Sequence, residues 1–192
     1  LRRLGMSPSV FHLNEGHSAF LTLELAREYL AANPDADFLD SIPAVRRQCV
    51  FTTHTPVSAG NDLFSTSEIR DCFDSGFIDA LKLNEEELFE LGRSDPDDKE
   101  EGFGMTPLAI RMCRSANGVS EKHGEVSRGL WKAMFPGADD TADVPISYVT
   151  NGVHAPTWVA PLFQGMYRST IGDDWNKRLA DPDDWAYAVD NL

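Results

Sequence analysis

The sequence predicts a three-layer α/β fold built around a mostly parallel sheet. Three short apolar runs, at residues 10–13, 49–52 and 146–149, are typical of buried strands, and longer amphipathic stretches separate them. This alternation indicates βα units. Histidine, asparagine or carboxylate side chains follow each strand, and ligands of open α/β sheets bind beyond the carboxyl ends of the strands. The sequence therefore predicts one shared site at that edge.

Helices are expected in the connections between the strands. Residues 18–30 have helical apolar spacing, and the pair 33–34 (Asn-Pro) closes this helix because a residue before proline disfavours helical backbone. Ser65 and Glu68 have the spacing of a capping box for a helix through Cys72.

Later segments carry similar local signals. Asn84 begins a helix that Gly92 ends, and Thr106, before a proline, is expected to cap another. The remaining expectations are a helix over 121–134, a tight turn at 151–152 and a short helical tail over 163–192.

Composition limits the classes of function. The chain has 192 residues, 42% of them hydrophobic, which is enough for one sizeable domain. Its net charge of −14 repels phosphate backbones and anionic lipid, so we expect neither nucleic acid nor a membrane as partner. Three scattered cysteines predict no disulfide framework and favour a cytoplasmic setting. The start at Leu1, without an initiator methionine, leads us to expect a piece of a longer protein.

An acidic stretch covers residues 94–103. It could bind a metal ion, but a solvated, flexible loop is the favoured interpretation. No pair of histidines has the i, i+4 spacing of a zinc protease, and no serine-hydrolase elbow or nucleotide-binding glycine motif occurs. We therefore predict no metal site.

The strand ends supply the candidate site residues. Asn14, Glu15 and His17 surround a glycine, and their donors and acceptors suit the hydroxyls of a sugar; they would equally serve as a helix N-terminus. His54 is either a ligand contact or a locally satisfied histidine. His123 either lines the same cleft or caps and packs its helix, whereas we expect His12 to be structural.

Four motifs, in this order, resemble the α-glucan (glycogen, starch and maltodextrin) phosphorylases, particularly their short bacterial form. They are the segments 12–20, 51–57, 116–127 and 149–158, which together span most of the chain. The resemblance implies a Rossmann-like fragment, namely the later part of the N-terminal domain of a two-domain, GT-B type glycosyltransferase. The catalytic cleft of such an enzyme lies between its two domains.

The resemblance also implies a reaction and roles. The whole enzyme would transfer a glucosyl unit from the non-reducing end of an α-1,4-glucan to phosphate, giving glucose 1-phosphate. By motif position, His54 would contact the glucosyl unit through its backbone carbonyl and the 6-hydroxyl of the sugar. Asn151 would also bind the sugar, and Val119 would present its backbone near the same hydroxyl. The other strand-end residues would form part of the pocket wall: Asn14, Glu15 and His17. Glu15 is expected to orient neighbours, since a free carboxylate base beside the sugar would favour hydrolysis.

The family carries pyridoxal phosphate on a lysine of the C-terminal domain. None of the five lysines of this chain lies in that motif, and the residues that hold the substrate phosphate belong to the missing C-terminal domain. We therefore expect no cofactor on this chain and no activity of the chain alone. Two alternatives stay open, a fragment of a nucleotide-sugar-dependent glucan synthase and a non-catalytic carbohydrate-binding domain. Whether the parent enzyme is a homo-oligomer also stays open.

Overall fold

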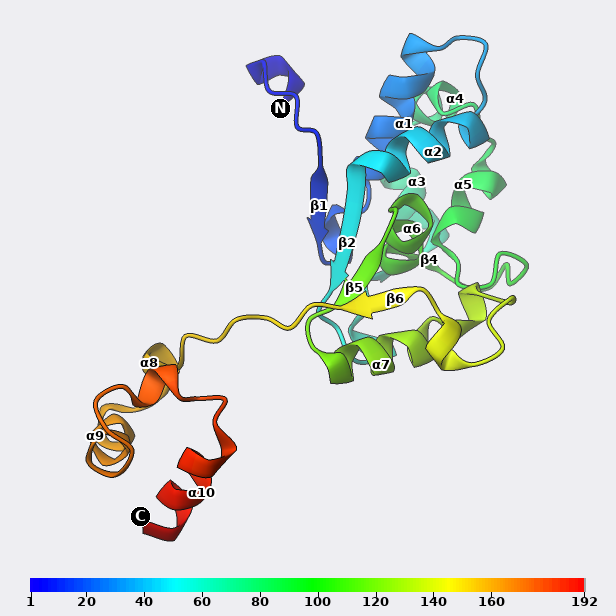
Figure 1. Ribbon diagram of the computed structural model, residues 1–192. Coiled ribbons are helices and arrows are strands. Elements are labelled where there is room, and N and C mark those ends of the chain that lie inside the picture. Colours follow the sequence, from blue (N-terminus) through cyan, green and yellow to red (C-terminus); the bar gives the residue numbers. More distant parts are fainter. Residues whose placement is uncertain (192) are drawn as a thin grey trace. The chain divides into compact units, whose positions relative to one another are not determined.

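A computed structural model describes residues 1–191 (Figure 1). The chain forms two compact units, Leu1–Thr150 and Asn151–Leu192. The helical tail expected over residues 163–192 falls within the second unit.

The first unit is built on a four-stranded parallel sheet. Its strands are β1 (Phe11–Asn14), β2 (Cys49–Thr53), β5 (Ala116–Gly118) and β6 (Ile146–Tyr148), in the order β1-β2-β5-β6. All three pairings are parallel, which confirms the predicted α/β class. A separate antiparallel pair joins β3 (Leu63–Phe64) to β4 (Phe103–Gly104).

The two faces of the sheet have different surroundings. The strand order follows the chain order, so right-handed crossovers place the connecting helices on one face. Leu13, Phe51 and Ile146 point to that face and are buried, whereas His12 and Asn14 on the other face are exposed. The first unit thus supplies the sheet and one of the two helical layers that the prediction places around it.

Seven helices connect these strands in the described part of the first unit: α1 (Leu21–Ala32), α2 (Phe38–Gln48), α3 (Thr66–Cys72), α4 (Ser75–Ala80), α5 (Glu85–Gly92), α6 (Met105–Met112) and α7 (Glu121–Leu130). The capping predictions at α3 and α5 are confirmed. Ser65 exchanges hydrogen bonds with Glu68, and Asn84 does the same with Glu87. These caps satisfy backbone N–H groups that helix starts leave without partners.

Two local predictions are corrected, and one helix was not predicted. Helix α6 begins beyond Gly104, and Thr106 instead donates its hydroxyl to the side chain of Asn61, 2.9 Å away. Helix α7 ends at Leu130 and gives way to a 3-10 turn, Lys132–Met134, rather than continuing to 134. Helix α2 has no predicted counterpart. It forms around Pro43 because Asp37 caps its start and the face with Phe38 and Val45 is buried.

The second unit contains α8 (Ala155–Trp158), α9 (Pro161–Thr170) and α10 (Pro182–Asn191). Trp175 is its buried centre, and the Tyr167 ring lies 5.3 Å from Trp175 and 5.0 Å from Trp185, between ring centroids. The tight turn expected at residues 151–152 is absent from the described structure, where this segment has no hydrogen-bonded turn. No helix among the described residues is long and apolar enough to cross a membrane.

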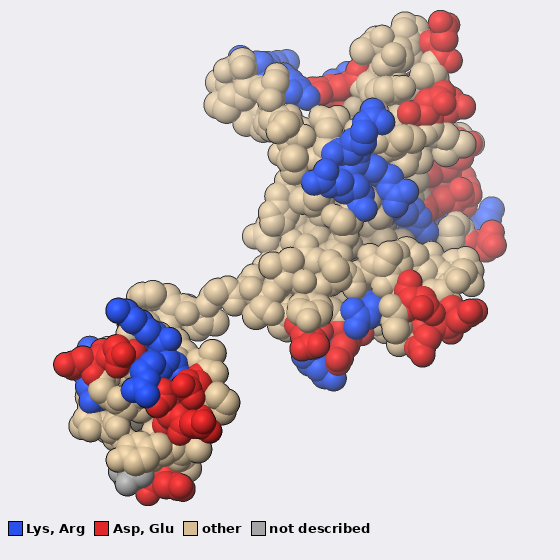
Figure 2. All heavy atoms as spheres, in the orientation of Figure 1, with Lys and Arg blue, Asp and Glu red and all other residues tan. Residues whose placement is uncertain are grey.

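Charge is spread unevenly over the first unit. Figure 2 shows acidic side chains gathered along the edge that carries α4 and α5, where Glu85, Glu86 and Glu87 form the first turn of α5. A basic group lies over the end of α2, whose last turn carries Arg46 and Arg47.

Candidate functional site

Parallel pairing brings three strand ends to one edge of the sheet. Asn14 pairs with Thr52 across β1 and β2, and Thr53 pairs with Gly118 across β2 and β5. The loops that begin at Glu15, His54 and Val119 therefore leave the sheet side by side. This is the edge at which open α/β sheets bind their ligands.

Glu15 joins the first two of these loops. One carboxylate oxygen, Oε2, accepts hydrogen bonds from the His54 backbone N–H at 2.7 Å and from the Thr55 hydroxyl at 3.0 Å. The other, Oε1, accepts the Gly16 N–H at 3.0 Å. The backbone of Glu15 has φ 83° and ψ 166°, a conformation that glycine normally adopts. Both oxygens of the side chain are thus used to hold backbone in place.

The His54 ring is held by the first loop. Its Nε2 lies 2.5 Å from the amide oxygen Oδ1 of Asn14. An amide oxygen only accepts, so Nε2 carries the proton and Nδ1 of the neutral ring is an acceptor. Both residues are exposed. We therefore find His54 tied to Asn14 by its ring and to Glu15 by its backbone, with its remaining nitrogen able to accept from a hydroxyl.

A chain of polar side chains supports these loops from the exposed face of the sheet. His12 Nε2 lies 2.7 Å from the Thr52 hydroxyl, which in turn donates to Oδ1 of Asn117 at 3.0 Å. This links β1, β2 and β5 on one face of the sheet, with His12 one step along the strand from the row that contains Thr52 and Asn117. Sequence reasoning assigned no role to Thr52 and Thr55, and for Asn117 it weighed only a turn or an amide facing a ligand. The parallel register, which sets Asn14, Thr52 and Asn117 in one row, is the signal that could have found them.

The third loop has its own support. Val119 donates its N–H to Nδ1 of His123 at 3.2 Å, and His123 is buried in the first turn of α7. Ser120 caps this helix by accepting the His123 N–H at 3.1 Å. A Cβ on Gly118 would lie 2.9 Å from the His123 ring, so β5 and α7 approach as closely as glycine allows. Of the two interpretations of His123, the structure shows capping and packing.

The other expected site residues lie at the margins of this group. His17 is exposed in the 3-10 turn Gly16–Ser18, and among the described residues no hydrogen bond joins it or Val119 to Asn14, Glu15 or His54. Asn151 is the first residue of the second unit and is exposed. Its place in a sugar pocket stays a prediction.

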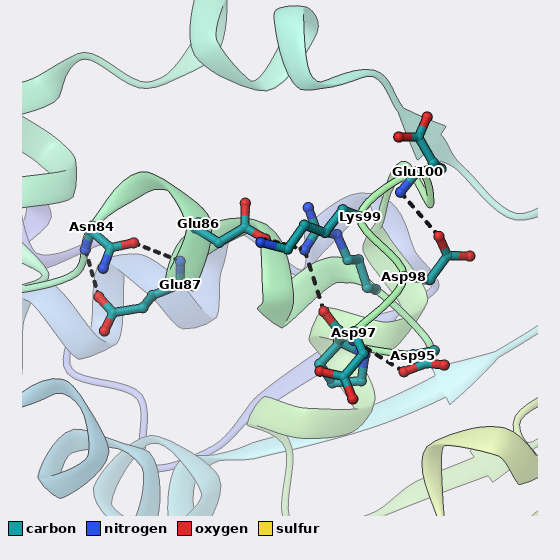
Figure 3. Close-up of polar contacts among 10 residues, drawn as sticks. Asn84, Glu86, Glu87, Asp95, Asp97, Asp98, Lys99 and Glu100 are labelled. Atoms are coloured by element: carbon teal, nitrogen blue, oxygen red, sulfur yellow. Dashed lines mark hydrogen bonds and ion pairs between the residues drawn. The ribbon is translucent and has the colours of Figure 1, made fainter.

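The acidic stretch uses its carboxylates on its own backbone (Figure 3). Asp95 accepts the N–H of Asp97, Asp98 accepts the N–H of Glu100, and Glu101 accepts the N–H and hydroxyl of Ser94. Within residues 1–191 no cluster of histidine, cysteine or acidic side chains is arranged to hold a metal ion.

The five lysines lie apart from the hydrogen-bonded group at the strand ends. Four of the five are engaged in hydrogen bonds or ion pairs: Lys82, Lys99, Lys122 and Lys132. The fifth, Lys177, lies in the second unit. Among the described residues no lysine takes part in the hydrogen-bonded group at the strand ends, and the absence of pyridoxal phosphate from this chain stays a prediction.

The chain is an α/β domain with its polar groups collected at the carboxyl edge of a parallel sheet, and comparison with known proteins identifies its relatives. It is 40% identical over 172 residues to the glycogen phosphorylase of Mycobacterium tuberculosis, covering 87% of this chain and 19% of that protein. It is 35% identical over 175 residues to the maltodextrin phosphorylase of Thermococcus litoralis, and 32% identical over 176 residues to the glycogen phosphorylase of Aquifex aeolicus. These two matches cover 91% of this chain, and 20% and 24% of the relatives.

The chain is therefore homologous to the glycogen and maltodextrin phosphorylases, which confirms the resemblance seen in its motifs. It spans about a fifth of the length of the curated relatives it matches. No family model matches the chain.

Proposed function

We propose that this chain is a segment of an α-glucan phosphorylase, an enzyme that transfers the terminal glucosyl unit of an α-1,4-glucan to phosphate. The observation that carries the proposal is the hydrogen-bonded group of Asn14, Glu15 and His54, in a chain that matches phosphorylases over most of its length. In this proposal the segment forms one wall of the sugar pocket. His54 and Asn151 bind the glucosyl unit, and Asn14, Glu15, His17 and Val119 shape the pocket around it.

The state of Glu15 supports transfer to phosphate over hydrolysis. A glycosidase needs a carboxylate that can activate water or attack the sugar. Both oxygens of Glu15 already accept hydrogen bonds, one from Gly16 in its own loop and the other from the loop after β2, so this carboxylate has a positioning task. A pocket walled by amides, imidazole and backbone binds a pyranose without activating water.

The cofactor and the phosphate site belong, in this proposal, to parts of the enzyme outside these 192 residues. Pyridoxal phosphate would sit on a lysine there, because none of the five lysines of this chain lies in the family's cofactor motif. Reduction with borohydride would then fix the cofactor to the whole protein and leave the 192-residue chain unlabelled. Labelling of the short chain at one lysine would contradict this assignment.

The activity is tested with the whole protein, maltoheptaose and inorganic phosphate. We expect release of glucose 1-phosphate that requires phosphate, and none from the 192-residue chain alone. His54→Ala should raise the KM for maltoheptaose at least tenfold, since it removes a hydrogen-bonding group from the sugar. Asp98→Ala, in the acidic loop, is the matched control and should leave KM unchanged.

Three results would contradict the proposal. Glucosyl transfer from a nucleotide sugar, without response to phosphate, would indicate a glucan synthase. Binding of maltoheptaose with no turnover by the whole protein would indicate a carbohydrate-binding domain. An unchanged KM in His54→Ala would remove this residue from the pocket.

A further inference from the structure

The loop after β5 depends on one buried histidine. His123 is 8% exposed and lies in the first turn of α7, directly behind the loop that carries Val119. The Val119 N–H points to the Nδ1 of His123 at 3.2 Å. This contact joins a residue proposed for the sugar pocket to one that lies behind it.

The hydrogen bond determines the protonation state of the ring. A backbone N–H can only donate, so Nδ1 of His123 must be an unprotonated acceptor, and in a neutral ring Nε2 carries the proton. Nε2 is buried and has no hydrogen-bond partner among the described residues. The Val119 amide is therefore the contact that fixes the orientation of this ring.

The same bond determines what Val119 can offer to a ligand. Its N–H is committed to His123, so its backbone can contribute only the carbonyl oxygen, an acceptor. A Cβ on Gly118 would lie 2.8 Å from the Gly124 nitrogen and 2.9 Å from Nδ1, so the loop is tightly packed against α7. Without the acceptor, the Val119 N–H would lose its partner, while the carbonyl of the same peptide, Gly118 O, would keep the hydrogen bond from the Val149 N–H at 3.0 Å.

We propose that His123 is a positioning residue for the sugar pocket: its unprotonated Nδ1 binds the Val119 N–H and so leaves the Val119 carbonyl as the backbone group of this residue that is available to a hydroxyl of the glucosyl unit. This rests on the proposed phosphorylase function. His123 does not touch the substrate and acts through Val119. The ligand class is a neutral pyranose that donates a hydroxyl.

The test compares three variants in the whole protein. His123→Asn keeps an acceptor, because the Asn Oδ1 occupies the place of Nδ1, and His123→Leu removes it. Ser127→Ala is the matched control, because Ser127 lies one turn further along α7, is fully buried and has an unpartnered hydroxyl. We expect His123→Leu to raise the KM for maltoheptaose about tenfold with a smaller change in kcat. His123→Asn should restore KM to within about threefold, and Ser127→Ala should leave it unchanged.

A second measurement needs no activity and separates this inference from the proposed function. Long-range 15N–1H NMR of the 192-residue chain reports which ring nitrogen of His123 carries the proton. We expect protonated Nε2 and unprotonated Nδ1, even if the whole protein proves not to be a phosphorylase. Protonated Nδ1 would overturn the inference, and so would a folded His123→Leu with wild-type KM. If His123→Leu fails to fold, an increase of tenfold in His123→Asn would overturn it instead.

Discussion

Glu15 lies in a strained backbone conformation and holds three hydrogen bonds, and the two contributions can be separated by substitution. Glu15→Ala removes the acceptor for Gly16, His54 and Thr55 while keeping a side chain at φ 83°. Glu15→Gly removes the same acceptor and relieves the strain. Glu15→Gln keeps one oxygen but turns an N–H toward a donor.

The expected magnitudes follow from these contacts. A hydrogen bond to a charged group contributes about 1.5–3 kcal/mol when it is buried. Gly16 is buried, whereas water can replace the carboxylate at the exposed His54, so we expect Glu15→Ala to lower the free energy of unfolding by about 2–4 kcal/mol. Backbone in this region costs roughly 1–3 kcal/mol for a residue other than glycine. Glu15→Gly should therefore be more stable than Glu15→Ala by about that amount.

Urea unfolding of the full chain measures these differences in the free energy of unfolding. Amide hydrogen exchange in β1, β2 and the residues that directly follow them assigns the differences to the first unit. The His54 and Gly16 amides should lose protection in all three variants, and least in Glu15→Gln. Equal stability of the alanine and glycine variants would refute the strain. Unchanged protection of His54 in Glu15→Ala would refute the role of the carboxylate.

Two further changes test other parts of the first unit. Gly118→Ala should destabilise the chain by at least about 2 kcal/mol, since the new Cβ would meet the backbone of α7. Gly129→Ala, whose new Cβ would have no atom within 4 Å, should instead stabilise the chain by about 0.5–1 kcal/mol. Thermal unfolding checks both, and a tolerated Gly118→Ala would contradict the close packing. A hydrogen bond from Arg93 lowers the pKa of Glu86, so this pair stabilises the fold above the ordinary pKa of glutamate and loses that effect as pH falls through the lowered pKa. Glu86→Gln should therefore be less stable than the wild type at pH 7, with a stability difference that narrows below the ordinary pKa of glutamate and closes below the lowered one. Glu100→Gln should show no such difference, and a difference that persists in acid would exclude the ion pair as its cause.

Local signals predicted local structure well. Ser65 and Asn84 indicate where their helices begin, because a capping residue and its partner lie three residues apart in the chain. Helix α2 has no such clear signal in the sequence, because Pro43 disfavours a helix. The helix forms because Phe38 and Val45 are buried against the rest of the unit, which only the structure shows. Likewise, nothing near Thr106 in the sequence indicates that its hydroxyl donates a hydrogen bond to the side chain of Asn61.

The location of the candidate site could be predicted from the sequence, but its pattern of hydrogen bonds could not. Polar residues after successive parallel strands must meet at one edge, so the proximity of Asn14 to His54 follows from the pattern. The positive φ of Glu15 and its hydrogen bonds to the second loop depend on the register of β1 against β2, which a single sequence does not determine. The contact between His123 and Val119 depends in the same way on how closely Gly118 lets α7 approach.

The hydrogen bonds of Glu101 have a consequence for evolution and engineering. By accepting from both the backbone and the hydroxyl of Ser94, its carboxylate brings together the two ends of the acidic stretch. The segment between them forms a loop closed at its base, which also contacts its neighbours where Arg93 donates to the Pro96 carbonyl and Lys99 pairs with Glu86. Insertions or an epitope tag placed between Pro96 and Glu100 would lengthen this loop without changing the distance between α5 and β4. A protease cut there would leave two pieces that remain associated.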